Sequence, residues 1–172
     1  FRNADNMRYE LMPYIYAQAK ESSQKGLPMM RALFLEYPND QGSWLVDNEY
    51  LFGSSMLVAP IFEEVTGRDV YLPEGTWIDY QTKKVYQGGW HKIEAGALPI
   101  IVLVRNGSAI PHIKLAQSTK DMDWSKLTLK VYATDATTTA TAKVFLPGTD
   151  ALETITVVKK GNEGEVTSNA LN

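Results

Sequence analysis

Residues 53–80 read GSSMLVAPIFEEVTGRDVYLPEGTWIDY, and this stretch decides the fold class of the chain. Three short runs in it are rich in β-branched and aromatic residues, and each is followed by turn-forming or polar residues. Runs of this kind, bounded by glycine and proline, are typical of strands. We predict strands at residues 56–62, 68–72 and 76–80.

The same alternation of short apolar runs and turn signals continues toward the C-terminus. It predicts further strands at residues 83–86, 90–95, 99–105, 108–113, 127–133, 139–146, 152–158 and 163–168. Hairpin turns are expected at Asn106-Gly107, Pro147-Gly148 and Gly161-Asn162, because these pairs adopt the backbone angles of tight turns. Many short strands at this spacing favour a mainly β fold, an antiparallel β-sandwich.

The N-terminal part has a different pattern, which predicts one helix over about residues 5–25. Its apolar stripe recurs at spacings of three and four, and its opposite face is expected to be wet. The stripe is Met7, Leu11, Tyr14, Ile15 and Ala19, and the wet face is Arg8, Glu10, Lys20 and Glu21. Asn3 or Asp5 is expected to cap the helix, Pro13 to kink it and Gly26 to end it.

The next residues, 29–38, are nearly all apolar and predict a buried segment, either extended or briefly helical. A short helical turn is expected within residues 44–52. The polar residues 116–126 are the best candidate for a linker.

Composition excludes several classes of function. The 172 residues carry a formal net charge of -3, so a basic surface for nucleic acid is not expected. There is no cysteine and there are two histidines, which leaves few ligands for a metal site. No apolar run reaches the ~20 residues of a membrane helix. We therefore predict no cofactor, no metal, no nucleic acid and no membrane partner.

No pair of acidic residues stands out as catalytic. Glu63 and Glu64 are adjacent, so in a strand they would point to opposite faces. Asp121 and Asp123 lie among lysines in the polar linker. Asp47 and Glu49 are expected to cap a short turn or to lie on its surface. We interpret all three pairs as solvated or structural.

His91, His112 and the pair Ser54-Ser55 are equally weak candidates for nucleophilic catalysis. No G-x-S-x-G motif or phosphate-binding loop accompanies them. We interpret both histidines as structural, so no catalytic, cofactor-binding or metal-binding residue is predicted.

The aromatic residues leave one alternative open. Trp44, Trp77, Trp90 and Trp124 could supply flat faces on which sugar rings stack. Residues in strands, however, face the core about as often as the solvent. The alternative is a non-catalytic carbohydrate-binding β-sandwich module.

Four consecutive segments resemble the C-terminal part of glycoside hydrolase family 31, and a fifth supports the resemblance. The segments are RYELMPYIYAQA (8–19), GLPMMRALFLEYP (26–38), YLFGSSMLVAPIFEE (50–64), VYLPEGTWIDY (70–80) and, later, VLVRNGSAIP (102–111). The family contains retaining α-glucosidases and α-xylosidases.

The resemblance implies a division of the chain. Residues 1–52 would be the terminal helical segment of a catalytic (β/α)8 barrel, and 53–118 the proximal C-terminal β-sandwich. Residues 119–172 would be a partial or short distal β module. The family's two catalytic aspartates lie upstream of this region.

The resemblance therefore implies the non-catalytic, C-terminal portion of a retaining α-glycosidase. The chain alone is expected to be inactive, with the upstream barrel as its partner and carbohydrate bound through the parent enzyme. The first residue, Phe1, fits the same interpretation of a piece of a longer protein. A third hypothesis is an interaction piece whose helix stripe docks a partner.

Overall fold

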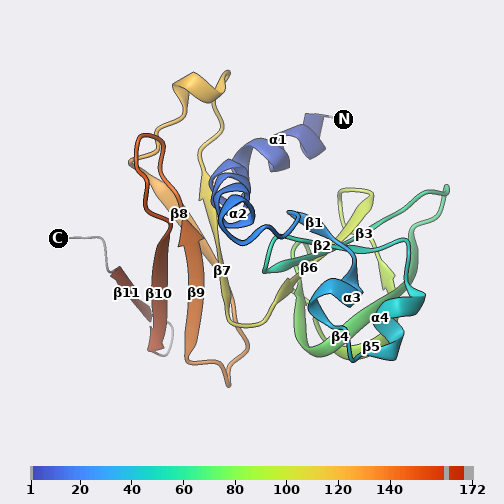
Figure 1. The fold of residues 1–172 in the computed structure, drawn as a ribbon. Coiled ribbons are helices and arrows are strands. Elements are labelled where there is room, and N and C mark those ends of the chain that lie inside the picture. Colours follow the sequence, from blue (N-terminus) through green and yellow to red (C-terminus); the bar gives the residue numbers. More distant parts are fainter. Residues whose placement is uncertain (1, 161–162, 169–172) are drawn as a thin grey trace. The chain divides into compact units, whose positions relative to one another are not determined.

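The computed structural model describes residues 2–160 and 163–168, with side chains through residue 158 (Figure 1). The chain forms two compact units. One is continuous, Pro28–Asn106, and we call it the middle unit. The other combines the N-terminal residues through Leu27 with those from Gly107 onward, and we call it the split unit. Both contain largely antiparallel sheets, which confirms the prediction of a mainly β, antiparallel fold.

The middle unit contains a six-stranded sheet with the strand order β1-β2-β3-β6-β4-β5. Its elements are β1 (Met30–Arg31), α3 (Leu33–Glu36), α4 (Gln41–Leu45), β2 (Tyr50–Phe52), β3 (Met56–Pro60), β4 (Gly67–Asp79), β5 (Val85–Glu94) and β6 (Ile100–Arg105). All of its strand pairs are antiparallel.

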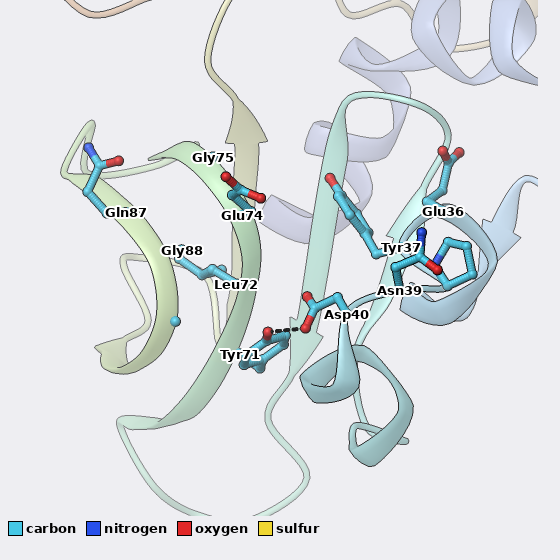
Figure 2. A pocket seen from close by; sticks show the side chains of 12 residues that line it. Glu36, Tyr37, Asn39, Asp40, Tyr71, Leu72, Glu74, Gly75, Gln87 and Gly88 are labelled. Carbon is cyan, nitrogen blue, oxygen red and sulfur yellow. Dashed lines mark hydrogen bonds between the residues drawn. The ribbon is translucent and has the colours of Figure 1, made fainter.

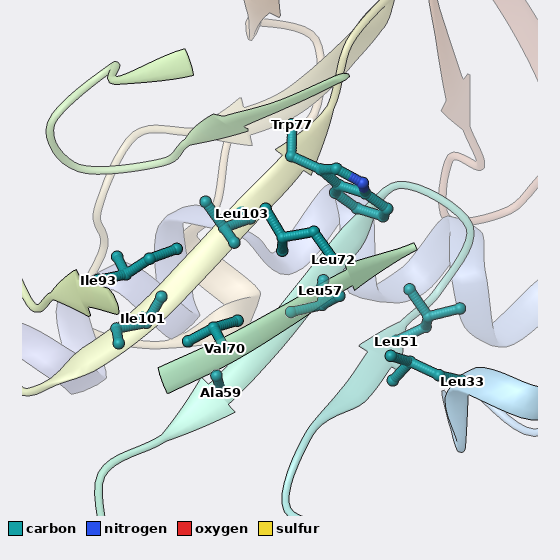
Figure 3. Packing of buried hydrophobic residues seen from close by; sticks show 10 residues of the cluster. All are labelled: Leu33, Leu51, Leu57, Ala59, Val70, Leu72, Trp77, Ile93, Ile101 and Leu103. Atoms are coloured by element: carbon teal, nitrogen blue, oxygen red, sulfur yellow. The ribbon is translucent and has the colours of Figure 1, made fainter. Parts of the chain in front are cut away.

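The core of this unit is built on β3 and β6. Leu57 pairs with Leu103 across the two strands, and both strands are buried at nearly every position. Side chains of β2, β4, β5 and α3 complete the cluster, as Figure 3 shows. The largest is Trp77, which is 1% exposed and donates its indole N–H to the Pro73 carbonyl over 2.9 Å.

Two pairs of predicted strands each form a single strand in the structure, so the predicted boundaries between them were wrong. The expected strands 68–72 and 76–80 are one strand, β4, whose register shifts between Leu72 and Thr76. The expected strands 83–86 and 90–95 are likewise one strand, β5. A bulge absorbs extra residues without ending a strand, so turn-forming residues did not mark a strand end here.

The helical turn predicted within residues 44–52 was also misplaced. The helix is α4, which begins at Gln41 because the Asp40 carboxylate accepts a bond from the Gly42 N–H. Residues 50–52 instead form β2, which pairs with β1 and β3. The segment 29–38 is both extended and helical, since β1 precedes α3.

The split unit contains a five-stranded sheet with the order β11-β10-β9-β7-β8. Its elements are α1 (Arg2–Glu10), α2 (Met12–Lys25), β7 (Ser108–Ile113), a 3-10 turn η1 (Thr119–Asp121), β8 (Leu127–Tyr132), β9 (Thr139–Val144), β10 (Glu153–Lys160) and β11 (Glu163–Ser168). The contact between β7 and β9 is parallel, and the other pairs are antiparallel.

The N-terminal helix has the predicted interruption and end. It breaks at Leu11 into α1 and α2, and Pro13 occupies the first turn of α2, where its missing N–H is tolerated. Gly26 caps α2 with a left-handed φ of 69°. The predicted N-caps were wrong, since α1 already begins at Arg2 and Asp5 instead accepts a bond from Arg8 inside the helix.

Glu21 was predicted on the wet face of the helix but is 3% exposed. Its Oε1 forms ion pairs with Lys25 of the same helix and Lys143 of β9. Burial alone would raise the pKa of Glu21, but the hydrogen bonds from the two ammonium groups outweigh it and lower the pKa. Ala19, predicted in the apolar stripe, is exposed instead.

The buried face of α2 packs within its own unit, on β7 and β9. Tyr16 contacts the ring of Phe145 at 4.9 Å, and Tyr14 and Ala17 are almost fully buried. This packing buries Leu11 and Tyr14 of the predicted stripe within the unit, while Met7 and Ile15 are partly buried, so docking of a partner by the stripe stays a prediction.

The boundaries of the two units differ from those of the predicted segments 1–52, 53–118 and 119–172. These segments describe parts of a longer protein and stay a prediction. The predicted linker, 116–126, contains the turn η1 and lies within the split unit. In the part of the chain that the structure describes, no helix has the length and apolarity to cross a membrane.

We predict that Leu103→Ala lowers the free energy of unfolding of the middle unit by about 2–5 kcal/mol, because Leu103 is fully buried between neighbouring strands. Leu45→Ala, the same chemical change at a side chain that is 80% exposed, should change it by less than about 0.5 kcal/mol. Urea unfolding followed by tryptophan fluorescence measures both. Equal effects would contradict the assignment of the core.

Candidate functional site

A cleft of about 710 Å³ opens in the middle unit and is the strongest candidate for a site (Figure 2). One wall is the segment Glu36–Asp40 between α3 and α4, and the other is the β4–β5 pair. Its size falls within the range of roughly 300–1,000 Å³ that small-molecule sites occupy.

Asp40 and Tyr71 join the two walls. The Tyr71 hydroxyl donates to Asp40 Oδ1 over 2.6 Å, and the same oxygen accepts the Gly42 N–H over 3.0 Å. Gly42 is required there, because a Cβ would lie 2.2 Å from the Tyr71 ring. The cap of α4 and the position of Tyr71 are thus set by one carboxylate.

The Tyr71 hydroxyl stays protonated over the physiological pH range. Burial, followed by its hydrogen bond to the Asp40 carboxylate, raises the pKa of Tyr71 to about 12. The hydroxyl therefore acts as a donor to Asp40, which fixes the wall of the cleft rather than offering a proton for catalysis.

The bulge in β4 and the glycines of β5 keep this wall open. Gly75 and Gly89 have φ values of 126° and 117°, which side-chain-bearing residues rarely adopt. A Cβ on either would meet no atom within 4 Å, so these positions border open space. At Gly88 a Cβ would lie 3.0 Å from the backbone of Glu74, so the bulge and the β5 strand approach closely.

An exposed aromatic ring stands beside the cleft. Trp90 is paired with Tyr71 across β5 and β4, and the two ring centroids lie 5.3 Å apart. Trp90 is 59% exposed although it is among the largest side chains. Nearby, Gln87 accepts a bond from the Thr76 hydroxyl over 3.0 Å and contributes an amide to the rim.

The lining of the cleft is acidic. It includes Glu36, Asp40 and Glu74, and none of the described residues that line it is Lys or Arg. Glu36 is paired with Arg31. Asp40 Oδ2 and the Tyr37 hydroxyl are buried atoms without a hydrogen-bond partner among the described residues.

Glu49 is the most perturbed carboxyl group of the middle unit. Its side chain is 0% exposed, and Oε1 accepts the Tyr71 N–H over 3.0 Å and lies 3.3 Å from Arg68 Nη2. Burial raises the pKa of Glu49 to about 7, although the Tyr71 N–H and Arg68 act in the opposite direction. A perturbed carboxyl can mark a catalytic site, but this one is inaccessible to substrate.

The acidic pairs singled out in the sequence lie in loops and turns. Glu63 and Glu64 are both exposed. Asp121 lies in η1, while Asp123 accepts bonds from Ser125 and pairs with Lys126. In the described residues, no cluster of three or more His, Asp or Glu side chains is placed to hold a metal ion.

The two histidines have structural surroundings. His112 is 3% exposed, and its Nδ1 lies 2.8 Å from the Ile110 carbonyl. His91 is near the surface with Nε2 at 2.6 Å from the Gln87 carbonyl, and its ring contacts Tyr86 edge-on.

The four tryptophans do not share one surface role. Trp77 is in the core, and Trp124 belongs to the split unit, where it contacts Tyr16. Trp44 is 59% exposed and stacks on Phe34 at 4.6 Å. Trp90 contacts Tyr71, which lines the cleft, and Trp44 donates its indole N–H to the carbonyl of Pro38 in the opposite wall over 2.9 Å.

Sequence reasoning missed the cleft residues Asp40, Tyr71, Glu74 and Gln87. The signal that could have found them is the pair of turn-like motifs Pro73-Glu74-Gly75 and Gln87-Gly88-Gly89, which we interpreted as the ends of strands. They oppose each other in one hairpin and hold the cleft open.

Residues 26–110 match the glycosyl hydrolase family 31 C-terminal domain, and this range includes the whole middle unit. The chain contains the C-terminal domain of glycoside hydrolase family 31. The resemblance drawn from the sequence segments is therefore confirmed.

Relatives with assigned activities agree with this family. The chain is 38% identical over 119 residues to Alpha-glucosidase 2 of Bacillus thermoamyloliquefaciens, covering 68% of the chain and 15% of the relative. It is 38% identical over 126 residues to alpha-xylosidase XylQ of Lactiplantibacillus pentosus, covering 67% of the chain and 16% of the relative.

A solved family 31 structure covers nearly the whole chain. The dextranase of Flavobacterium johnsoniae, complexed with glucose, matches 97% of the chain and 22% of its own length, with 32% identity and a TM-score of 0.81. The match supports the β-sandwich architecture expected for the family 31 C-terminal region. The chain spans less than a quarter of the length of these three proteins.

We predict that Glu49 makes the family 31 domain less stable as the pH rises. The folded state binds the Glu49 proton more tightly than the unfolded state, whose pKa is near the ordinary 4.5. Its contribution is greatest below that value, falls as the pH rises to about 7 and is constant above it. The fall is on the order of 3 kcal/mol.

The test compares the free energy of unfolding of the wild type and Glu49→Gln from pH 4 to pH 8. The difference between the two should change with pH over this window, because the variant has no carboxyl group to titrate at residue 49. Glu64→Gln, at an exposed site, is the control and should follow the wild type. Parallel curves for all three proteins would contradict the prediction.

Proposed function

We propose that the chain is the C-terminal, non-catalytic portion of a retaining α-glycosidase that hydrolyses α-linked sugars of oligo- or polysaccharides. The match of residues 26–110 to the family 31 C-terminal domain carries this proposal. The parent enzyme's catalytic barrel would be the covalent partner of the chain, and the carbohydrate substrate would be bound through that barrel.

The similar proteins support a parent enzyme that acts on α-linked sugars. The relatives include an α-glucosidase and an α-xylosidase, and a solved neighbour is a dextranase. The chain spans 15–22% of the length of these three, which leaves room in such proteins for a catalytic domain. Both glucosides and xylosides are therefore substrates to test.

The carboxylates of the chain support a non-catalytic role. Hydrolysis with retention requires two accessible carboxyl groups about 5–5.5 Å apart, one as nucleophile and one as general acid/base. Here Asp40 caps a helix, Glu49 is enclosed beside Arg68, and Glu21 is held between two lysines. Asp79 accepts the backbone N–H groups of a turn at residues 81 and 82. Each of these groups has a structural partner that substrate would have to replace.

In this proposal the predicted segments have distinct roles in the parent enzyme. Residues 1–52 are the terminal helical segment of the barrel, residues 53–118 the proximal sandwich and residues 119–172 a short distal module. The buried β3 and β6 strands make the proximal segment a rigid support, since rigid scaffolds position the loops of an active site.

We predict that the 172-residue chain releases no p-nitrophenol from p-nitrophenyl α-glucoside or α-xyloside above the rate in buffer, because the catalytic carboxylates are proposed to lie elsewhere in the parent enzyme. Absorbance at high protein concentration measures release, and circular dichroism verifies that the chain is folded. The same assay with a known α-glucosidase added is the positive control. Saturable turnover that co-purifies with the chain would contradict the proposal.

A further inference from the structure

We propose that the cleft of the middle unit, together with the exposed Trp90, is a binding site for neutral oligosaccharides. Three independent features carry the inference: the shape of the cleft, the aromatic ring beside it and the chemistry of its lining.

The shape is produced by backbone that side chains do not fill. The β4 bulge displaces Glu74, and the β5 strand opposite carries Gly88 and Gly89 rather than side chains. A Cβ at Gly75 or Gly89 would project into open space, so a ligand can approach the backbone of both strands closely. A cleft of about 710 Å³ has room for more than one sugar ring.

The aromatic component is the Tyr71–Trp90 pair. Tyr71 lines the cleft and is held in place by Asp40, while Trp90 contacts its ring at a centroid distance of 5.3 Å. The C–H face of a pyranose ring is apolar and packs against such rings. Trp90 is 59% exposed, so the face of its indole ring is available to pack against a sugar.

The polar component suits hydroxyl groups. Asp40 Oδ2 is a buried acceptor and the Tyr37 hydroxyl a buried donor, and neither has a partner among the described residues. Glu74 and Gln87 add a carboxylate and an amide at the rim. Carboxylates accept hydrogen bonds, and amides both donate and accept, so together they match the mixed roles of sugar hydroxyls.

The charge of the lining selects against acidic sugars. Three carboxylates and no described Lys or Arg line the cleft, so a uronate or sulfated sugar would be repelled and left unpaired. The ligand is therefore a neutral saccharide. Since the relatives act on α-glucosides and α-xylosides, isomaltotriose, maltotriose and a xyloglucan oligosaccharide are the probes of choice.

The experiment titrates the folded chain with each probe and follows tryptophan fluorescence and binding heat. We expect saturable binding in the millimolar range by at least one neutral probe. Trp90→Ala and Gln87→Ala should each weaken it, Trp90→Ala by at least about tenfold. Phe62→Ala is the matched control, because Phe62 is an aromatic side chain of the same unit that is 77% exposed and does not line the cleft, and it should bind as the wild type does.

Three outcomes would overturn the proposal. They are no binding of any neutral probe at millimolar concentration, loss of binding in Phe62→Ala but not in Trp90→Ala, and equal binding of trigalacturonate. Circular dichroism of each variant separates lost binding from lost folding. The binding assay does not depend on turnover, so a failure to bind sugar would leave the proposed family 31 function unchanged. Hydrolysis by the chain would contradict the proposed non-catalytic function but not the proposed sugar site.

Discussion

The middle unit depends on the burial of β3 and β6 on both faces. Strands of half-buried sheets alternate apolar and polar residues, but these two are apolar at almost every position. The neighbouring elements must therefore cover both faces of these two strands. Leu33 of α3 and Trp77 of β4 both belong to the cluster that does so. The α3–α4 segment is consequently held close to the sheet, and the residues that join its two helices form one wall of the cleft.

The bulge in β4 follows from the same requirement. Val70 and Leu72 before the bulge and Trp77 after it all join the core. Pro73, Glu74 and Gly75 lie between them, where the register shifts against β5. The bulge allows side chains on both sides of it to face the core. The residues displaced by the bulge are those that shape the cleft.

Local patterns in the sequence predicted most of the strands, the break at Pro13 and the left-handed end at Gly26, because each depends on residues close together in the chain. Sequence could not predict the burial of Glu21, since its second cation, Lys143, lies 122 residues away. Nor could it predict the buried state of Glu49 or the need for glycine at residue 42, because both depend on the β4 strand. The cleft was missed for the same reason, as its walls come from segments that meet only in the folded sheet.

The split unit is discontinuous in the chain, and this affects the order in which the protein assembles during synthesis. Helix α2 emerges from the ribosome before the middle unit, whereas β7 and β9, against which it packs, emerge after it. Within this chain, the strands that cover its apolar face are therefore made only after the middle unit. The continuous middle unit has all of its own strands by then, and its early folding would replace a long flexible loop with a compact body.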